Sequence, residues 1–310
     1  MKNGHFTHFS IVQRIPPGDR RLGKLYEARM EDGRKTTVTA ITLAQDPSVR
    51  NRQIKELDNR MRLLTVLRHI NVLRHFHVAY SGNYAPVRVP HYFIVTELCQ
   101  GGTLEEAVRT VALDRDVCHR WSSQLLQGLC YLHQKRITHG DLRGANVFLT
   151  TRDIATCNLK ISNIGQSSPR FDANAVGLGL SFEWNPQQNM LPFMSPEMRR
   201  HLTARSNISP WDWSHVGRKT DVWSFGCILI QILTGEPPRM RRLDQSSLDK
   251  GLEEKRLTKT ISTGNAEFDG QPVVLNSWPE ETKLILDRCL RRDSTNRPSS
   301  RQLTQMFFFI

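Results

Sequence analysis

The sequence has no closely spaced pair of cysteines. It contains six cysteines in 310 residues, and the nearest two, Cys118 and Cys130, are 12 positions apart. Structural zinc sites are usually built on cysteine pairs separated by only a few residues, so this class of metal site is excluded. Because scattered single cysteines are typical of a reducing compartment, we expect a cytoplasmic protein.

Long hydrophobic runs are also missing. The longest apolar segment, 222–233, is interrupted by polar residues and is shorter than the roughly 20 residues that a membrane-spanning helix needs. The residues that follow Met1 do not form the apolar core of a signal peptide. No internal repeat and no low-complexity stretch is present. We therefore expect a globular chain with no membrane partner.

Positive charge is in excess, but it does not form a single block. The chain has 43 lysines and arginines against 30 acidic residues, a net charge of +13. Such a balance can indicate nucleic-acid binding, yet the basic residues occur in short, separated clusters without stacking aromatic residues or a groove-binding helix. We expect no nucleic acid as partner. A solvated surface is the simplest interpretation, and an acidic protein partner is the next.

Hydrophobic periodicity predicts a strand-rich first part and a helical second part. Residues 38–43 alternate with a period of two, and 92–95 form a β-rich run, which is typical of strands. Ile54, Leu57, Met61 and Leu64 recur at helical spacing between them. Amphipathic or apolar helices are then predicted around 121–132, over 221–234, and in 284–290 and 302–308.

The most informative segment is 139–146, which reads HGDLRGAN. It resembles the catalytic loop of protein kinases, H-R-D-L-x-x-x-N. Three further segments agree with it in order and spacing: 195–197 (SPE), 221–226 (DVWSFG) and Arg297, which resembles the arginine that pairs with the glutamate of the A-P-E motif. Together these motifs identify the chain as similar to the protein kinases over residues 9–310.

Several segments narrow this resemblance to the mitogen-activated protein kinase kinase kinase group of Ser/Thr kinases. They are 144–146 (GAN), 125–133 (LLQGLCYLH), 192–197 (PFMSPE) and the tail 289–299. The resemblance implies an α+β, bilobal protein-kinase fold. Its small β-rich N-lobe would cover 9–98, and its larger helical C-lobe would cover 99–310.

The resemblance implies a glycine-rich, phosphate-binding loop at 18–23, but this loop is altered. Gly18 and Gly23 match the outer glycines of G-x-G-x-x-G, whereas the middle glycine is replaced by Arg20. Glycines let backbone N–H groups approach phosphates closely. Arg20 would obstruct that approach or supply a cation of its own, unless the segment is an ordinary solvated turn.

The strand lysine and helix glutamate of the family are altered as well. Aligning V-A-I-K with 39–42 places Ala40 and Thr42 on one face as nucleotide-binding residues, with Thr42 at the lysine position. Counting back nine residues from His69 places Arg60 at the glutamate position. A solvated surface position is the favoured interpretation of Arg60. The sharper hypothesis is that its guanidinium group reaches the nucleotide and replaces the missing lysine.

The metal-binding and catalytic positions are only partly kept. The resemblance assigns the catalytic loop positions to Asp141, Arg143 and Asn146, with Asp141 as proton acceptor and Asn146 as a magnesium ligand. The magnesium-binding aspartate of D-F-G is replaced by Asn163, a weak ligand because its side chain is neutral. Asp141 and Asn146 are equally well explained by hydrogen bonds within the loop.

The remaining cofactor-binding positions are those that would hold an adenine ring. Thr96 corresponds to the gatekeeper, and Glu97 to Cys99 correspond to the hinge whose backbone binds adenine. Gly140 replaces the arginine of H-R-D, which removes the usual anchor for a phosphorylated activation loop.

Two functions follow from these departures. The first is a pseudokinase that acts as a scaffold or regulator by docking to another kinase or a scaffold protein. For it, ATP and magnesium are in doubt, and a nucleotide without metal is the remaining option. The second is an active Ser/Thr kinase whose phosphate-binding cations are displaced to Arg60, Arg20 or Lys24.

Overall fold

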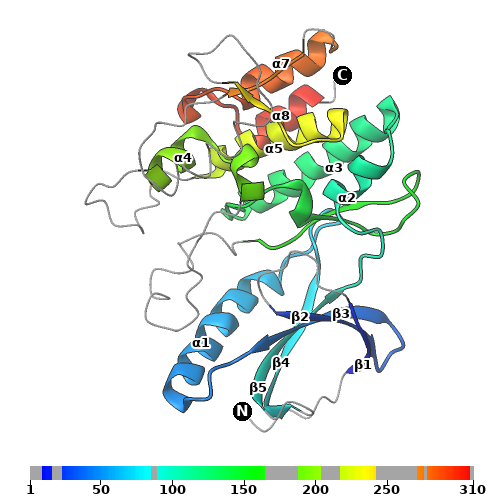
Figure 1. The fold of residues 1–310 in the computed structure, drawn as a ribbon, viewed down its shortest axis with the longest axis vertical. Helices are drawn as coiled ribbons and strands as arrows, with labels where there is room; N and C mark the ends of the chain where they lie inside the picture. The colour runs from blue at the N-terminus through cyan, green and yellow to red at the C-terminus, as the bar shows by residue number, and fades with distance from the viewer. Residues whose placement is uncertain are drawn as a thin grey trace. The chain divides into compact units, whose positions relative to one another are not determined.

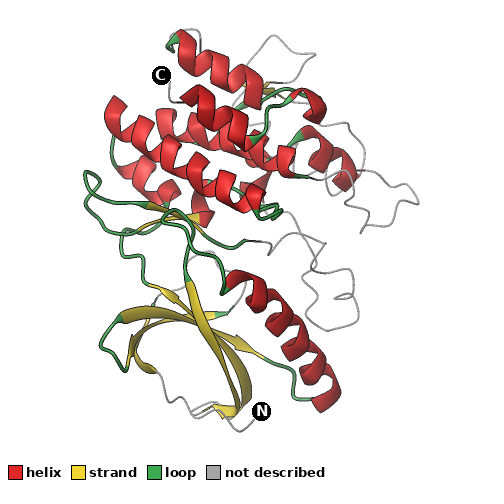
Figure 2. Cartoon of the chain, turned by 180° about the vertical axis from the view of Figure 1, so that it is seen from behind, coloured by secondary structure: helices red, strands yellow, loops and turns green. Residues whose placement is uncertain are grey.

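The computed structural model describes residues 9–15, 23–84, 89–164, 188–203, 217–241, 271–275 and 278–307. These residues divide into two compact units, one formed by residues up to 100 and the other by residues from 101 onward. The first unit is built mainly from strands and the second mainly from helices (Figures 1 and 2). An α+β kinase fold is therefore confirmed.

The N-terminal unit is an antiparallel sheet of five strands in the order β1-β2-β3-β5-β4. The strands are β1 (Phe9–Arg14), β2 (Lys24–Met30), β3 (Lys35–Thr42), β4 (His75–Tyr84) and β5 (Val89–Glu97). The predicted strands at 38–43 and 92–95 correspond to the central pair, β3 and β5. Because β3 is flanked by strands on both sides, five of its eight residues are buried, and the buried residues lie on both faces of the sheet.

One helix, α1 (Pro47–Leu64), belongs to this unit. Its N-terminus is capped by the Asp46 carboxylate, which accepts from the backbone N–H groups of the first turn. Leu57, Met61 and Leu64 are buried, as their helical spacing predicts. The hydroxyl of Tyr92 on β5 donates a hydrogen bond of 2.7 Å to Asp58 on α1. This bond identifies the face of the sheet on which α1 lies.

The C-terminal unit contains helices and two short hairpins. The helices are α2 (Leu104–Thr110), α3 (Arg115–Gln134), α4 (Pro196–Thr203), α5 (Arg218–Thr234), α7 (Glu280–Cys289) and α8 (Ser300–Phe307). The hairpins are β6 (Val147–Leu149) with β7 (Leu159–Ile161), and β8 (Met240–Arg241) with β9 (Gln271–Pro272). Short 3₁₀ turns lie at Gly144–Asn146, Gln188–Phe193 and Ser294–Asn296.

The central helix of this unit is α5. Thirteen of its 17 residues are buried, from Thr220 to Ile232, which fits its uniformly apolar sequence. It ends at Gly235, whose φ of 77° lies in the left-handed region that glycine adopts readily. The predicted pairing of Glu197 with Arg297 is also present, with Nη1 to Oε1 at 2.6 Å.

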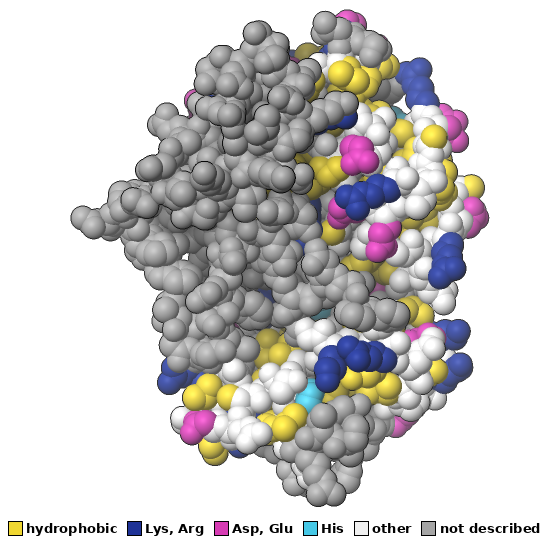
Figure 3. All heavy atoms as spheres, in the orientation of Figure 1, with side chains coloured by type: hydrophobic (Ala, Val, Ile, Leu, Met, Phe, Trp, Pro, Cys, Tyr) yellow, Lys and Arg dark blue, Asp and Glu magenta, His cyan; other side chains and the backbone are white. Residues whose placement is uncertain are grey.

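Two global properties follow from the described residues. None of their helices is long and apolar enough to cross a membrane. On the face shown in Figure 3, lysine and arginine side chains occur singly or in small groups among acidic and apolar ones. Among the described side chains on that face, positive charge is thus not gathered into one patch.

Candidate functional site

The segment that resembles the catalytic loop lies between α3 and β6 in the C-terminal unit. His139 is fully buried, and its Nε2 donates to the carbonyl oxygen of Ser162, which follows β7, at 2.8 Å. Its Nδ1 accepts from the backbone N–H of Asp141 at 3.2 Å. The ring therefore connects the start of the loop to the end of the β6–β7 hairpin.

A buried carboxylate on α5 fixes the same loop from the other side. Asp221 accepts from the backbone N–H groups of His139 and Gly140 at 2.8 and 2.9 Å and contacts His133 Nε2 at 2.9 Å. Burial alone would raise the pKa of Asp221, but hydrogen bonds from His133 and Gly140 outweigh it and hold the pKa below its ordinary value. Gly140 has a φ of 79°, a conformation that favours glycine over the family's arginine.

Three predicted site residues form a chain of hydrogen bonds within this unit. Nδ2 of Asn146 donates to the backbone oxygen of Asp141 at 2.7 Å and to its carboxylate Oδ2 at 2.9 Å. Nδ2 of Asn163 in turn donates to Oδ1 of Asn146 at 2.8 Å. The structure thus brings together Asp141, Asn146 and Asn163.

The chemistry of the partners fixes the orientation of both amides. Both groups that Asn146 Nδ2 contacts on Asp141 are acceptors, so this end of the Asn146 amide must be the donor. Its oxygen then faces Asn163, which must present its own nitrogen. Asn163 reaches this position with a φ of 58°, in the left-handed region that asparagine tolerates better than most residues.

This arrangement bears directly on metal binding. The oxygen of Asn146 that the sequence offers as a magnesium ligand already accepts a hydrogen bond, and the facing group on Asn163 is a donor. Magnesium prefers carboxylate oxygens. Within the part of the chain that the structure describes, no group of three or more His, Cys, Asp and Glu side chains could hold a metal ion.

Arg143 lies beside Asp141. Its Nε is 3.4 Å from Asp141 Oδ1, and the side chain is only 5% exposed. Among the described atoms, Nε and Nη1 of Arg143 have no hydrogen-bond partner. A buried guanidinium group held mainly by one ion pair is costly. It therefore offers unused donors to an anionic group beside Asp141.

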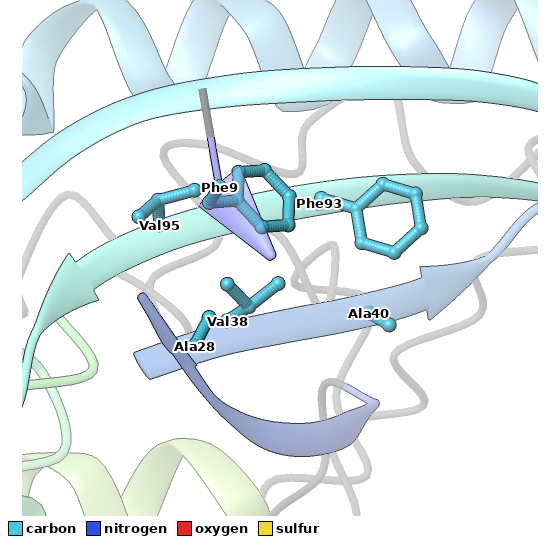
Figure 4. Close-up of a cluster of buried hydrophobic side chains, with 6 residues drawn as sticks. All are labelled: Phe9, Ala28, Val38, Ala40, Phe93 and Val95. Atoms are coloured by element: carbon cyan, nitrogen blue, oxygen red, sulfur yellow. The ribbon is translucent and has the colours of Figure 1, made fainter. Parts of the chain in front are cut away.

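The other predicted site residues lie in the N-terminal unit. Which of them lie near one another depends on the face of the sheet to which each side chain points. Tyr92 points to the α1 face, where it bonds to Asp58. Its neighbour Phe93 points to the opposite face, because successive residues of a strand alternate. There it packs in an apolar cluster with Phe9, Ala28, Val38, Ala40 and Val95 (Figure 4).

The register of β3 against β5 shows on which face of the sheet each predicted strand residue lies. Ala40 pairs with Phe93, and Thr42 pairs with His91, so both lie on the cluster face. Thr96 pairs with Thr37 and lies on the α1 face. Ala40 and Thr42 thus share one face of β3, as predicted, whereas Thr96 lies on the opposite face of the sheet. The β3 residues on the face of Thr96 are Thr37, Thr39 and Ile41.

Thr42 has a local partner of its own. Its side chain is exposed, and its Oγ1 lies 3.1 Å from Nε2 of His91, whose Nδ1 lies 2.9 Å from the carbonyl oxygen of Val89. Since a carbonyl can only accept, Nδ1 carries the proton and Nε2 accepts from the threonine hydroxyl. Sequence reasoning missed His91, because only the strand register places it opposite Thr42.

Arg60 is not a solvated surface residue, contrary to the favoured interpretation. Its exposed fraction is 9%, and its charge acts on His75, the residue of β4 that pairs with Thr96. Burial lowers the pKa of His75 to about 4, although the Leu73 carbonyl opposes this shift, and the positive charge of Arg60 lowers it further. Arg60 therefore belongs to the α1 face, in the neighbourhood of Thr96.

The hinge and the glycine-rich loop are described only in part. The backbone N–H of Glu97 donates to the carbonyl oxygen of Arg74 at 3.0 Å, and Cys99 is partly exposed. Gly23 has a φ of 147°, and a Cβ built there would lie 2.3 Å from the Ala40 carbonyl oxygen. Only glycine fits so close an approach. Gly18 and Arg20 lie outside the described residues.

The fold and the catalytic-loop geometry define a protein-kinase domain, and comparison with known families agrees. The family model described as protein kinase domain matches residues 18–309. The chain belongs to the protein kinase family.

Curated relatives narrow the similarity further. The chain is 28% identical over 81% of its length to mitogen-activated protein kinase kinase kinase 12 of Rattus norvegicus, covering 23% of that protein. It is 26% identical over 71% of its length to mitogen-activated protein kinase kinase kinase 4 of Homo sapiens, covering 12%. It is 23% identical over 87% to mitogen-activated protein kinase kinase kinase A of Dictyostelium discoideum, covering 24%. The chain thus spans a quarter or less of each of these relatives.

Proposed function

We propose that this chain is a pseudokinase, a kinase-fold module that regulates another kinase by binding it instead of transferring phosphate. The observation that carries the proposal is the hydrogen bond from Asn163 Nδ2 to Asn146 Oδ1. In the family these two positions face a divalent cation from two sides. Here the Nδ2 donor of Asn163 faces the Oδ1 acceptor of Asn146. The two side chains therefore satisfy each other by a hydrogen bond, without a metal ion between them.

The charge balance supports the same conclusion. An amide at position 163 leaves the metal position without the carboxylate that the family places there. Magnesium loses strongly bound water only when charged oxygen ligands compensate. To bind the ion, Asn163 and Asn146 would also have to give up a hydrogen bond that is worth about 1 kcal/mol.

The phosphate-binding lysine is also missing under the strand register that the structure shows. Because Thr39 shares the α1 face with Thr96, we propose that Thr39, and not Thr42, occupies the lysine position. Losing a cation about 4 Å from a phosphate forfeits on the order of 4 kcal/mol at an effective dielectric constant of 20. Either assignment leaves a threonine where the family has a cation.

A nucleotide without metal remains compatible with the N-terminal unit. Arg60 supplies one buried cation on the α1 face, and Thr37 and Thr96 supply hydroxyl groups on the same face. Guanidinium groups bind phosphate oxygens well. We propose that any nucleotide bound here relies on Arg60 for charge and binds equally well without magnesium.

The relatives suggest what such a module regulates. All three compared proteins carry the name mitogen-activated protein kinase kinase kinase. We propose that the chain acts in the cytoplasm within a kinase cascade of this type, with another kinase or a scaffold protein as its partner.

The alternative is an active Ser/Thr kinase with displaced cations. The retained Asp141 and its bond from Asn146 favour it. Against it, the two described candidate cations lie on opposite faces of the sheet. Lys24 pairs with Ala40 on the cluster face, whereas Arg60 lies on the α1 face. They do not converge on one phosphate group.

Thermal unfolding with ATP tests the proposal. The full chain would be heated with ATP in EDTA and with ATP in excess magnesium, beside the variants Arg60→Gln and Asp141→Asn. A ligand at a hundred times its Kd stabilises by about 2.7 kcal/mol, which raises the unfolding temperature of a chain of this size by about 4 °C. We expect the same shift with and without magnesium, and a smaller shift for Arg60→Gln.

A phosphorylation assay on a generic peptide completes the experiment. We expect no phosphate transfer above that of Asp141→Asn. Magnesium-dependent transfer that Asp141→Asn abolishes would overturn the proposal and establish the alternative. If ATP raises the unfolding temperature neither in EDTA nor in magnesium, the chain does not bind the nucleotide. The proposed scaffold function would be unaffected by that result.

A further inference from the structure

An exposed apolar patch lies at the C-terminal end of α1. We define the α1-end patch as Leu63, Val66 and Ile70, whose exposed fractions are 46%, 68% and 59%. Leu63 and Val66 are three residues apart at the end of the helix, and Ile70 is in the turn that follows. Large apolar side chains that are exposed close together in the sequence are candidates for an interaction site.

The patch is held in a defined conformation by hydrogen bonds. Thr65 continues the helix through its backbone N–H to Met61, and Leu67 closes a tighter turn onto Leu64. Arg68 Nη1 donates to the carbonyl oxygens of Thr65 and Leu67 at 2.5 and 2.7 Å. Val66 is thus displayed on an ordered turn that does not bury it.

The surrounding sequence carries charge of one sign. From residue 59 to residue 96 the chain has no aspartate and no glutamate, but it has five arginines: Arg60, Arg62, Arg68, Arg74 and Arg88. Arg62 and Arg68 are exposed, and together with the three patch residues they lie within the nine residues 62–70. An occupant of this surface therefore meets apolar side chains bordered by positive charge, without a nearby acidic side chain from the same stretch.

We propose that the α1-end patch is a docking surface for an acidic, amphipathic segment of a partner protein. Aliphatic side chains of the partner segment would cover Val66 and Ile70, and carboxylates of the same segment would face Arg62 and Arg68. This inference goes beyond the proposed function, because it holds whether or not the nucleotide site is active.

Other occupants fit the charge less well. A second copy of the chain would bring the same arginines to a symmetric contact, and like charges across an interface are unfavourable. An anionic membrane would meet two nearby cations, fewer than the four to eight of a typical lipid-binding cluster. Among the described residues, the large apolar side chains that are exposed include no aromatic ring for base stacking.

A peptide-binding experiment tests the proposal on the full chain. The probe is a fluorescein-labelled helical peptide of about 18 residues, with leucines at i, i+3, i+4 and i+7 and glutamates flanking them. A second peptide replaces each glutamate by lysine. We expect the acidic peptide to bind at least tenfold more tightly than the basic one, with an affinity that falls as salt is added.

Variants locate the binding surface. Val66→Ser with Ile70→Ser should weaken the acidic peptide at least tenfold, and Arg62→Glu alone should weaken it severalfold. Leu284→Ser is the matched control, because Leu284 is similarly exposed, at 49%, on α7 in the other unit. It should leave the Kd within twofold. If the double variant fails to fold, Arg62→Glu still decides the outcome.

Three results would overturn the proposal. The first is an acidic-peptide affinity that neither variant changes, and the second is equal binding of both peptides. The third is that the double variant loses self-association in light scattering, or loses binding to anionic phosphatidylserine vesicles, without losing the peptide. That result would assign the α1-end patch to a second copy or to a membrane.

Discussion

Arg297 holds Glu197 through two parallel hydrogen bonds, from Nη1 to Oε1 at 2.6 Å and from Nη2 to Oε2 at 2.8 Å. The Arg297 side chain is fully buried, and its charge lies 5.1 Å from the centre of the Trp223 ring. Burial alone would raise the pKa of Glu197, but the hydrogen bonds and charge of Arg297 outweigh it and lower the pKa. The pair joins residues 100 positions apart in the sequence.

Removing the arginine of this pair should be strongly destabilising. Arg297→Met leaves a buried carboxylate without its cation, which costs about 3–5 kcal/mol. Urea unfolding would measure the loss. The control is Arg109→Met, which breaks a partly exposed pair with Glu105 on α2 and should cost less than about 1 kcal/mol. Equal losses in the two variants would contradict the assignment.

Stability should fall between pH 7 and pH 5 because of His75. Burial keeps the pKa of this histidine at about 4 in the folded chain, while the unfolded chain binds the proton near 6.5. The unfolded state therefore gains protons first, and the folded state loses about 2 kcal/mol of stability by pH 5.

The variant His75→Leu isolates this effect. Its packing change acts at both pH values, so the difference between urea unfolding at pH 7 and at pH 5 reports the histidine alone. We expect this difference to shrink by about 2 kcal/mol in the variant. An unchanged difference would show that His75 is protonated or exposed in the folded chain.

The stability of the chain should become dependent on magnesium when the aspartate that the family has at position 163 is restored. Asn163→Asp places a carboxylate against the oxygen of Asn146 and removes the donor of their hydrogen bond. In EDTA we expect a loss of about 1–3 kcal/mol, which millimolar magnesium partly reverses. The wild type should not respond to magnesium.

Asn158→Asp is the matched control for this experiment. Oδ1 of Asn158 accepts from Gln124 Nε2 at 2.9 Å, a bond that a carboxylate keeps. The control should show neither the loss in EDTA nor the recovery in magnesium. A magnesium response of the wild type similar to that of Asn163→Asp would count against the pseudokinase proposal.

The strand register can be tested with two lysine substitutions. Thr39→Lys puts a second cation on the face of the buried Arg60 and should destabilise the chain, whereas Thr42→Lys lies on the cluster face at an exposed position. Adding Arg60→Glu should recover stability for Thr39→Lys, with a coupling energy of about 0.5–3 kcal/mol. The same double-mutant cycle, with Thr42→Lys in place of Thr39→Lys, should show no coupling energy with Arg60→Glu. Coupling at Thr42 in place of Thr39 would contradict the register.

The sequence predicts the elements of the fold well, because their signals are local. The uniformly apolar run of α5 and its stop at Gly235, and the helical spacing of Leu57, Met61 and Leu64, depend on neighbours a few residues apart. The motif at 139–146 is equally local. Each of these predictions is reproduced in the structure.

The faces of the central strand could not be predicted in the same way. On β3 threonines and apolar residues occur on both faces, and both faces are buried. The alternation of side chains alone therefore does not tell which set of alternate β3 residues lies on the α1 face. Only the pairing of β3 with β5 decides this. The bond between Asn163 and Asn146 was equally inaccessible, since it joins residues 17 apart and needs a positive φ at Asn163.

The phenol of Tyr92 on β5 fixes the position of α1 on the sheet through its hydrogen bond to Asp58. Burial and the neighbouring Asp58 raise the pKa of this phenol above its ordinary value, so it keeps its proton and its bond at every physiological pH. Turning the helix about its axis would leave a half-buried carboxylate without its donor. A partner that displaces α1 from the sheet would therefore have to break this bond or move β5 together with the helix.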